Sequence, residues 1–434
     1  MKPGIRRGLL RWLLPGMHVK RWLLLLIAGI TFFSLGCAYL LRALYDVRPL
    51  PSLFYYLTLQ FIPRWGRALL LGAVGGVLMA VGLVRLNRAL LAPFLRPGQE
   101  KVVDALYRHR QRQRGPKVVA IGGGTGLSVL LRGLKEYTDH LTAIVTVADD
   151  GGSSGRLRRE LGVLPPGDFR NCIAALSEAE GLTTRLFQYR FGEGAGLDGH
   201  SFGNLFITAM AGVTGSFEQA LVESSHVLAV RGRVLPSTLQ DVTLCADLWE
   251  EREGAEAGWR RVEGESSIPR QAGTIERVFL EPEEVSAYPE AVKAVLEADL
   301  IVAGPGSLYT SVLPNLLVSD VAQAIRTSRA MKVYVCNVAT QPGETDGYSV
   351  SDHLRALQKH VGTGLFHLVL ANDHFLGAMA GPSWGLEWVR LSPPDEMDCR
   401  LLTADLVDET FPWRHDSHKL ARCLIELYEA HSRE

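Results

Sequence analysis

Two long apolar segments lie near the beginning of the chain. Residues 22–41 form a run of twenty positions without a charge, long enough for a helix to cross a bilayer. Residues 68–84 form a second run of seventeen positions, whose four glycines suit close helix packing. These runs predict a membrane anchor over residues 1–97 with two transmembrane helices. A signal peptide for the first run and a buried soluble helix for the second are the alternatives.

From residue 117 onward, short apolar runs alternate with helical patterns. This alternation predicts an α/β fold in three layers, a parallel sheet with helices on both faces, over residues 117–434. Residues 248–285 are charged and break the pattern, so we expect a small antiparallel insertion there. The predicted strands are 117–121, 141–147, 300–303, 332–336 and 365–370, and the predicted helices include 127–135, 286–298 and 318–329.

The charges are divided unevenly along the chain. Residues 1–117 hold 19 Lys and Arg against 3 Asp and Glu, although the whole chain holds 46 of each kind. Basic residues before the first run and after the second predict that both ends are cytoplasmic, as in a multi-pass protein of the inner membrane with lipid around its hairpin. The basic linker, residues 98–116, either contacts anionic headgroups through its arginines or is a solvated run of charge.

The remainder of the chain is acidic, which argues against nucleic acid as a partner. The six cysteines are scattered without a CxxC pair, a pattern typical of reduced, cytosolic core thiols rather than disulfides or a zinc site. The sequence leaves open a homodimer and a protein partner.

A glycine cluster directly follows the first predicted strand. Gly122, Gly123, Gly124, Thr125 and Gly126 allow a tight turn and close approach of the backbone to an anion, and the next helix offers its free N–H groups. No Lys-Ser/Thr pair follows, so this is not a Walker A motif and only loosely resembles the dinucleotide fingerprint. A purely structural turn is the alternative.

Two carboxylates, Asp149 and Asp150, follow the second predicted strand. They suit Mg²⁺, a ribose or base contact, or a role as general base. Gly151, Gly152, Ser153 and Ser154 continue as a second anion-binding turn, or else as an ordinary helix cap. These residues also fit G-x-S-x-G with Ser153 as a nucleophile, which is disfavoured because the aspartates separate the motif from the strand.

Further polar residues occur at similar places. Asp168 and Arg170 follow a rigid Pro-Pro-Gly turn, where Arg170 suits a phosphate clamp or an ion pair with Asp168. His200 and Asn204 lie one helical turn apart in an apolar segment and both face the ligand in this interpretation. The remaining candidates follow later strands or lie near the end of the chain: Gly304, Gly306, Ser307, Asn337 and Arg414.

Parallel sheets bind ligands beyond the carboxyl ends of their strands. Several glycine-rich turns at such ends are stronger evidence than any one of them. The sequence therefore predicts one site for a phosphate-bearing small molecule, a nucleotide or nucleotide-sugar.

Seven motifs in order give the soluble part a specific resemblance. It resembles the family of the archaeal 2-phospho-L-lactate transferase CofD and the bacterial YvcK proteins, called gluconeogenesis factors. The motifs are IGGGTGLSVLLRGLK, ADDGGSSGRLR, PPGDFRNC, HSFGNL, ADLIVAGPGSLYTSVLPNLLV, CNVATQPGET and RHDSHKLA.

The resemblance implies a Rossmann-like fold and one of two functions. The bacterial branch, which this sequence favours, implies a non-catalytic UDP-sugar-binding regulator of carbon metabolism, cell-wall synthesis and cell shape. The other branch implies a phospholactate transferase using a nucleotide-diphosphate donor and Mg²⁺, with Asp149 or Asp150 holding metal or activating the acceptor. An NAD-dependent oxidoreductase is disfavoured. The resemblance does not extend to residues 1–116. On the bacterial interpretation the ligand is contacted by Gly122 to Gly126, Asp149 to Ser154, His200, Asn204, Gly304 to Ser307, Asn337 and Arg414.

Overall fold

The computed structural model describes residues 110–178, 181–192, 196–250, 258–375, 386–392 and 399–433, together with separate positions between 30 and 85. The chain divides into two units, residues 1–110 and 111–434, and each is described by itself. The predicted membrane segments, 22–41 and 68–84, lie largely outside the described residues, so the two transmembrane helices stay a prediction.

Within the described part of the chain, no single helix is both long and apolar enough to cross a bilayer. Helices α10 (Phe202–Thr214) and α11 (Phe217–Val227) meet that criterion only as a pair bent by 120°, on length and composition alone.

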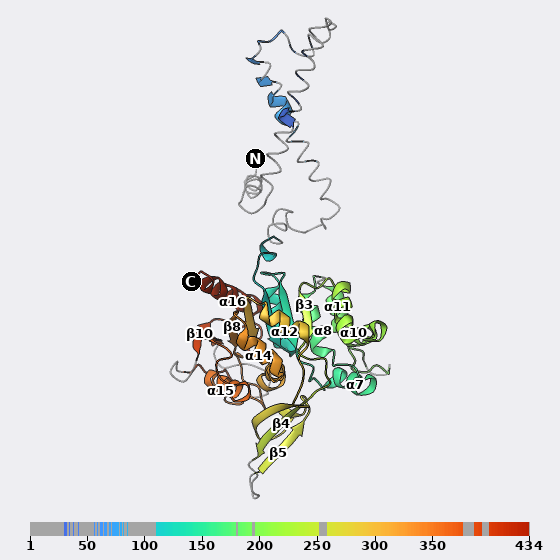
Figure 1. The fold of residues 1–434 in the computed structure, drawn as a ribbon, viewed down its shortest axis with the longest axis vertical. Helices are drawn as coiled ribbons and strands as arrows, with labels where there is room; N and C mark the ends of the chain where they lie inside the picture. Colours follow the sequence, from blue (N-terminus) through green and yellow to red (C-terminus); the bar gives the residue numbers. More distant parts are fainter. Residues whose placement is uncertain are drawn as a thin grey trace. The chain divides into compact units, whose positions relative to one another are not determined.

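The second unit is organised by a parallel sheet of seven strands, visible edge-on in Figure 1. The strand order is β10-β9-β8-β7-β1-β2-β3, so the chain runs outward from β1 in one direction and from β7 in the other. The crevice between β1 and β7 is the switch point at which such sheets bind ligands. The strands are β1 Val118–Gly122, β2 Leu141–Val145, β3 Arg233–Pro236, β7 Leu300–Ala303, β8 Met331–Val335, β9 Leu368–Asn372 and β10 Arg400–Ala404.

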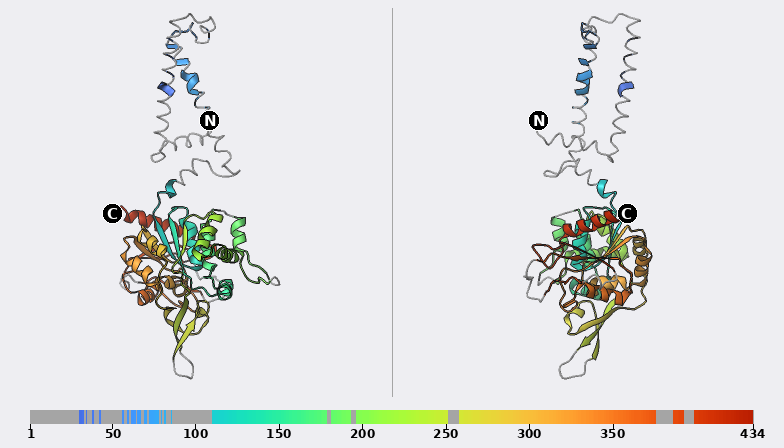
Figure 2. Two further views of the ribbon diagram at one scale, coloured as in Figure 1. Left: turned by 45° about the vertical axis from the view of Figure 1, so that its right-hand side comes forward. Right: turned by 90° about the vertical axis from the view of Figure 1, so that its left-hand side faces the viewer.

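The four central strands are buried along their whole length because both faces of the sheet are covered, and they are apolar except for Thr142 in β2 and Lys332 in β8. Right-handed crossovers in the two directions place the helices on opposite faces, which gives the predicted three layers (Figure 2). One group packs around α6 (Gly124–Leu134), which contacts α8 and α16, and in another α12 packs against α14. The remaining bounds are α7 Gly152–Leu161, α8 Gly167–Leu176, α9 Leu182–Gln188, α12 Pro289–Leu296, η3 Leu308–Val312, α13 Leu313–Leu316, α14 Ser319–Thr327, α15 Val350–Val361 and α16 Ser417–His431.

The predicted antiparallel insertion is confirmed as a three-stranded arm that projects from the body (Figure 1). It consists of β4 (Thr243–Glu250), β5 (Gly258–Glu263) and β6 (Thr274–Glu281), with β4 in the centre. One face packs on the core through residues such as Leu244 and Leu280. The short 3₁₀ helix η2 (Ile268–Arg270) joins β5 to β6.

The end of the basic linker is part of the second unit. Arg112 is buried and pairs with Asp139 at 3.2 Å, and Gln113 accepts a hydrogen bond from His140 through its backbone carbonyl. The expectation that Arg112 contacts lipid headgroups, or is a solvated charge, is therefore wrong for this residue.

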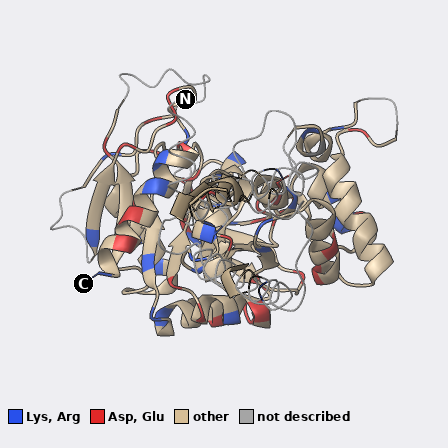
Figure 3. Cartoon of the chain, turned by 90° about the horizontal axis from the view of Figure 1, so that it is seen from above, with Lys and Arg blue, Asp and Glu red and all other residues tan. Residues whose placement is uncertain are grey.

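Charged residues of both signs are scattered along the described elements of the second unit (Figure 3). On α7, for example, Arg158 forms an ion pair with Asp241, and on α16 Lys419 pairs with Asp405. Ion pairs with a solvent-exposed partner contribute little to stability.

Candidate functional site

A large pocket of about 530 Å³ opens beyond the carboxyl ends of β1, β7 and β8. This volume is in the ordinary range for a site that takes a nucleotide-sized ligand. Its walls come from four chain segments that are distant in sequence. They are the turn 123–126, the loop 305–311, the segment 337–344 and the pair Trp413 and Arg414, and the lining also includes Glu265, Pro269 and His415.

The first glycine turn lies where the sequence predicts it. Gly123 is the N-cap of α6 and has no side chain with which to cap the helix. Asp168 accepts the Gly124 N–H, and the next N–H groups of the first turn face the pocket side of the helix start, where an anion would bind. Gly124 has φ of +61°, which favours glycine. A Cβ at Gly126 would lie 2.4 Å from the carbonyl oxygen of Pro305, so the two glycine-rich turns touch. Asn315 donates to the carbonyls of Gly122 and Ser311 and so fixes the first glycine turn to the loop after β7. The sequence did not indicate this residue.

Asn337 positions the second turn rather than presenting a free amide. Its Oδ1 accepts from the Gly306 N–H at 3.1 Å, and its Nδ2 donates to the Gly306 carbonyl at 2.9 Å. Gln341 donates to Ser307 Oγ at 2.7 Å and continues the chain of contacts. Asn337 still lines the pocket, but its predicted role as a direct ligand contact becomes one of holding Gly306 in place.

The C-terminal motif contributes two residues to the large pocket. Arg414 is exposed there, with its guanidinium 5.6 Å from the ring centre of Phe411. The next residue, His415, is buried, and burial lowers its pKa to about 4, so the ring is neutral at physiological pH. The ring bonds the backbone of Cys336, while Nε2 has no partner among the described residues. Asp416 caps α16 instead of facing the ligand.

Glu265 and Glu344 line the same pocket, and sequence reasoning assigned neither of them to it. Glu344 is buried, accepts a hydrogen bond from Thr310 at 3.1 Å, and leaves Oε2 without a partner. Burial raises its pKa to about 7. Nothing in the local sequence around Glu265 marks it, because it enters the site only through the fold of the arm.

A smaller pocket of about 260 Å³ holds most of the remaining predicted residues. It collects the turn after β2, the start of α8 and one residue of α10. Its lining is Asp149, Gly151, Gly152, Ser153, Ser154, Gly167, Asp168, Arg170, Asn171, Arg190 and Asn204.

Arg170 is the main positive group of the small pocket. It is buried, and burial followed by the charge of Arg190 lowers its pKa to about 10. Its Nη2 donates to Asn171 at 2.9 Å, whereas Nε and Nη1 have no partner among the described residues. No ion pair with Asp168 forms, so that alternative from the sequence is wrong. Two unpaired donors on a buried cation suit an anionic or strongly polar ligand group.

His200 and Asn204 both reach Ser153, although they do not share a helix. Ser201 caps α10, so His200 lies before the helix and Asn204 within its first turn. The Nδ1 of His200 lies 3.0 Å from Ser153 Oγ, and Asn204 donates to the same oxygen at 3.1 Å. The predicted polar pair is therefore brought together on Ser153, and only Asn204 lines the pocket.

Asp168 lines the small pocket and lies against Gly123, which lines the large pocket. Its Oδ2 lies 2.5 Å from the place a Cβ would occupy on Gly123, and it accepts the Gly124 N–H. Burial, then repulsion from Asp149, raises the pKa of Asp168 to about 7. Burial also raises the pKa of Asp149, which accepts from the Gly151 N–H. Asp150 instead accepts from the Ser266 N–H of the arm and does not act beside Asp149 as a pair.

Several predicted residues support the site without lining either pocket, namely Gly122, Asp150, His200 and Gly304. In the part of the chain that the structure describes, no three His, Cys, Asp or Glu side chains group closely enough to hold a metal ion by themselves. A Mg²⁺ ion bound together with substrate phosphates needs only one or two protein carboxylates, so its binding by Asp149 or Asp150 stays a prediction.

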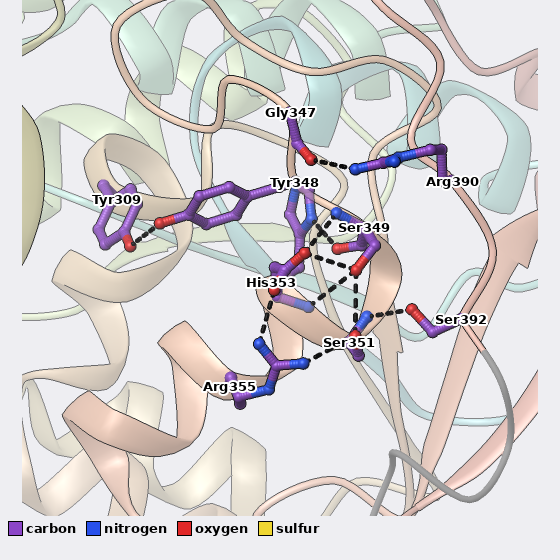
Figure 4. A network of polar contacts seen from close by, with 10 residues as sticks. Tyr309, Gly347, Tyr348, Ser349, Ser351, His353, Arg355, Arg390 and Ser392 are labelled. Carbon is purple, nitrogen blue, oxygen red and sulfur yellow. Dashed lines mark hydrogen bonds and ion pairs between the residues drawn. The ribbon is translucent and has the colours of Figure 1, made fainter.

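A polar network behind the large pocket fixes the segment that follows β8 (Figure 4). Tyr309 of η3 and Tyr348 share a hydrogen bond of 2.8 Å between their hydroxyls. Ser349 and Asp352 form a capping box at the start of α15. Arg390 donates to the Gly347 carbonyl at 3.0 Å. These contacts fix the chain at the start of α15, a few residues beyond the segment 337–344 that lines the pocket.

The fold and the two pockets define the class of protein: an α/β protein with a candidate small-molecule site at the switch point of a parallel sheet. Residues 118–381 match the family described as "2-phospho-L-lactate transferase CofD". The chain belongs to the CofD family, and its relatives place it in the YvcK-type branch.

The relatives are of two lengths. The "Gluconeogenesis factor" of Bacillus subtilis is 47% identical over 72% of this chain and 98% of the relative. A "Putative gluconeogenesis factor" of Nostoc is 48% identical over 96% of this chain and 92% of the relative. A crystal structure of a UPF0052 family protein from Bacillus halodurans superposes with a TM-score of 0.66, at 45% identity, over 72% of this chain and 99% of its own. The fold is thereby that of the family.

Proposed function

We propose that the protein binds a UDP-sugar at the crevice between β1 and β7 and acts as a regulator of carbon metabolism, cell-wall synthesis and cell shape, without turning its ligand over. The observation that carries the proposal is the contact between Asp168, which lines the small pocket, and Gly123, which lines the large one. The name of the relatives, gluconeogenesis factor, supports the metabolic part.

The large pocket suits the nucleoside and the phosphates. Its glycine turn lies at the start of α6, where backbone N–H groups and the helix dipole favour anions, although Asp168 already accepts the Gly124 N–H. Arg414 adds a positive charge from another segment. The uncharged residues 337–341 also line this pocket, and their backbone and amide groups suit the edge of a base. Phosphates at the turn would leave the rest of the ligand free to extend toward Asp168.

The small pocket suits the distal end of the ligand. Arg170 presents unpaired donors there, and Asn204 presents an unpaired Oδ1, so both hydrogen-bond donors and acceptors are available. A sugar, which offers hydroxyls of both kinds, uses such a mixed set better than a second nucleotide ring does. This arrangement supports a nucleotide-sugar over a dinucleotide.

The test is a calorimetric titration of the purified full chain with UDP-N-acetylglucosamine, UDP-glucose, NAD and GDP, with and without Mg²⁺. We expect micromolar binding of a UDP-sugar that is recovered intact after hours of incubation. Preference for GDP with Mg²⁺, or consumption of the ligand, would move the assignment to the transferase.

The transferase is the second candidate because a specific feature favours it. The family is named for phospholactate transfer, and Asp168 has a pKa of about 7 beside the glycine turn. A carboxyl that titrates near neutrality suits a general acid or base. Asp149, whose pKa is also raised, is the other candidate for activating an acceptor hydroxyl. A nucleotide-diphosphate-linked donor is the substrate this function would need.

The membrane tether stays part of the proposal. An inner-membrane hairpin over residues 1–97 with the second unit in the cytoplasm would hold the regulator near wall synthesis, where a protein partner would act on it. Relatives that extend over 96% of this chain support a role for the first unit in part of the family.

A further inference from the structure

Glu265 occupies a position that links the arm to the large pocket. It follows β5 in the loop that leads to η2, and it lines the pocket. The loop is held on both sides. Ser266 donates its N–H to Asp150 at 2.8 Å, and Gly343 lies so close to Pro269 that an added Cβ would come within 2.1 Å of its carbonyl oxygen. The backbone around Glu265 is therefore fixed against the site.

The surroundings of the Glu265 carboxyl are negative. Burial, then the charges of Asp149, Asp168, Glu344 and Asp150, raise its pKa to about 8. A phosphate placed against this wall would meet four further carboxyl groups and be repelled. The phosphates of a ligand must therefore lie at the glycine turn, and an uncharged part must face Glu265.

Two buried atoms in the same pocket point to the chemistry of that part. Oε2 of Glu344 and Nε2 of His415 are buried and have no partner among the described residues. A neutral imidazole nitrogen and a carboxyl oxygen are hydrogen-bond acceptors. Left unpaired, each costs stability, so a ligand that donates to them gains affinity. Ring hydroxyls are such donors.

We propose that Glu265 is a specificity-determining residue on the side of the large pocket that faces Asp149 and Asp168 of the small one. It hydrogen-bonds to hydroxyl groups of the ligand's sugar where the ligand passes into the small pocket and, with Glu344, distinguishes a UDP-sugar from UDP. The proposal rests on the proposed function, since it names the part of that ligand which meets the arm. This contact gives the three-stranded arm a role, because the loop at its base contacts the sugar when one is attached to the nucleotide.

The test compares the full wild-type chain with Glu265→Ala, Glu265→Gln and a matched control, Glu263→Gln, which changes an exposed charge two residues earlier on the same arm. Each is titrated with UDP-glucose, UDP and 2′-deoxy-UDP, both without and with Mg²⁺. In wild type and in the control, UDP-glucose should bind at least about tenfold more tightly than UDP, the effect of one ordinary hydrogen bond or more. In Glu265→Ala this ratio should fall below about threefold, with UDP itself bound as before.

A second readout follows from the protonation of the carboxyl. Below pH 8 the neutral group donates and accepts, whereas above pH 8 its negative charge adds to those of Asp149, Asp168, Glu344 and Asp150. Between about pH 6.5 and about pH 9.5, one and a half pH units on either side of the midpoint, the ratio of the UDP-glucose affinity to the UDP affinity should fall in wild type and stay flatter in Glu265→Gln.

Each contrary outcome has its own meaning. If the ratio is unchanged in Glu265→Ala, the proposal is wrong. If Glu265→Ala instead loses the preference for UDP over 2′-deoxy-UDP, Glu265 contacts the ribose, and its assignment to the sugar is wrong. If Mg²⁺ is needed for binding and Glu265→Gln abolishes that need, the wall holds a cation and the proposal is wrong. If wild type binds no uridine nucleotide, the proposed function itself fails.

Discussion

The buried carboxyl of Asp168 should make the stability of the second unit depend on pH. Its pKa is about 7 in the folded protein against an ordinary value of 3.8. Between these values the unfolded chain binds fewer protons than the native one, so stability falls as pH rises and levels off above pH 7. Three units of difference correspond to about 4 kcal/mol.

Replacing Asp168 by Asn removes this titration. The amide oxygen still accepts the Gly124 N–H, but the new NH₂ group is buried without an assigned partner and costs about 1–3 kcal/mol. We therefore expect the variant to be less stable than wild type near pH 4 and more stable near pH 8, by about 1–3 kcal/mol, so that the two stability curves cross.

The assay is denaturant unfolding followed by tryptophan fluorescence at a series of pH values. Asp373→Asn is the matched control, because Asp373 is exposed and its replacement should leave the wild-type curve unchanged. Parallel curves for wild type and Asp168→Asn, without a crossing, would show that Asp168 is ionised in the native state and would refute the reasoning.

Two further substitutions test how the site is built. Gly126→Ala places a Cβ 2.4 Å from the Pro305 carbonyl oxygen, so it should push the two glycine-rich turns apart, cost about 1–3 kcal/mol of stability and weaken nucleotide binding. The control Gly212→Ala adds a Cβ in open space on α10 and should change neither stability nor binding. If the two variants behave alike in thermal melts and titrations, the contact between Gly126 and Pro305 is contradicted. Asn315→Ala leaves the carbonyls of Gly122 and Ser311 without this donor and should lower the free energy of unfolding by about 2–4 kcal/mol. Denaturant unfolding measures this loss. An unchanged denaturation midpoint would show that Asn315 does not hold the turn.

Much of the sheet could be predicted because its strands are buried on both faces and appear as continuous apolar runs. β7 is found at its predicted bounds, 300–303, and β1 and β8 within one residue of theirs. The fifth predicted strand, 365–370, is β9 shifted to 368–372, because Leu365 and Phe366 pack in the core ahead of the strand. β3 and β10 were missed, since both are short edge strands.

The candidate site could be predicted where residues follow strands directly, as Gly123–Gly126 and Asp149 do. Contacts between distant segments could not. Glu265 enters the large pocket because the root of the arm folds back on Asp150, and no local pattern marks such a residue. His200 was placed in a helix that begins after it, because the capping role of Ser201 is visible only in the backbone geometry.

The central claim is that one ligand uses both pockets across the contact of Asp168 with Gly123. The most direct test is titration of UDP-N-acetylglucosamine into the full chain carrying Arg170→Ala, in the small pocket, or Arg414→Ala, in the large one, with Arg422→Ala, exposed on α16, as control. The account predicts that each site variant loses at least about tenfold in affinity, as expected for a charge-assisted contact, while the control binds like wild type. Full affinity in Arg170→Ala beside a loss in Arg414→Ala would contradict a ligand that spans both pockets.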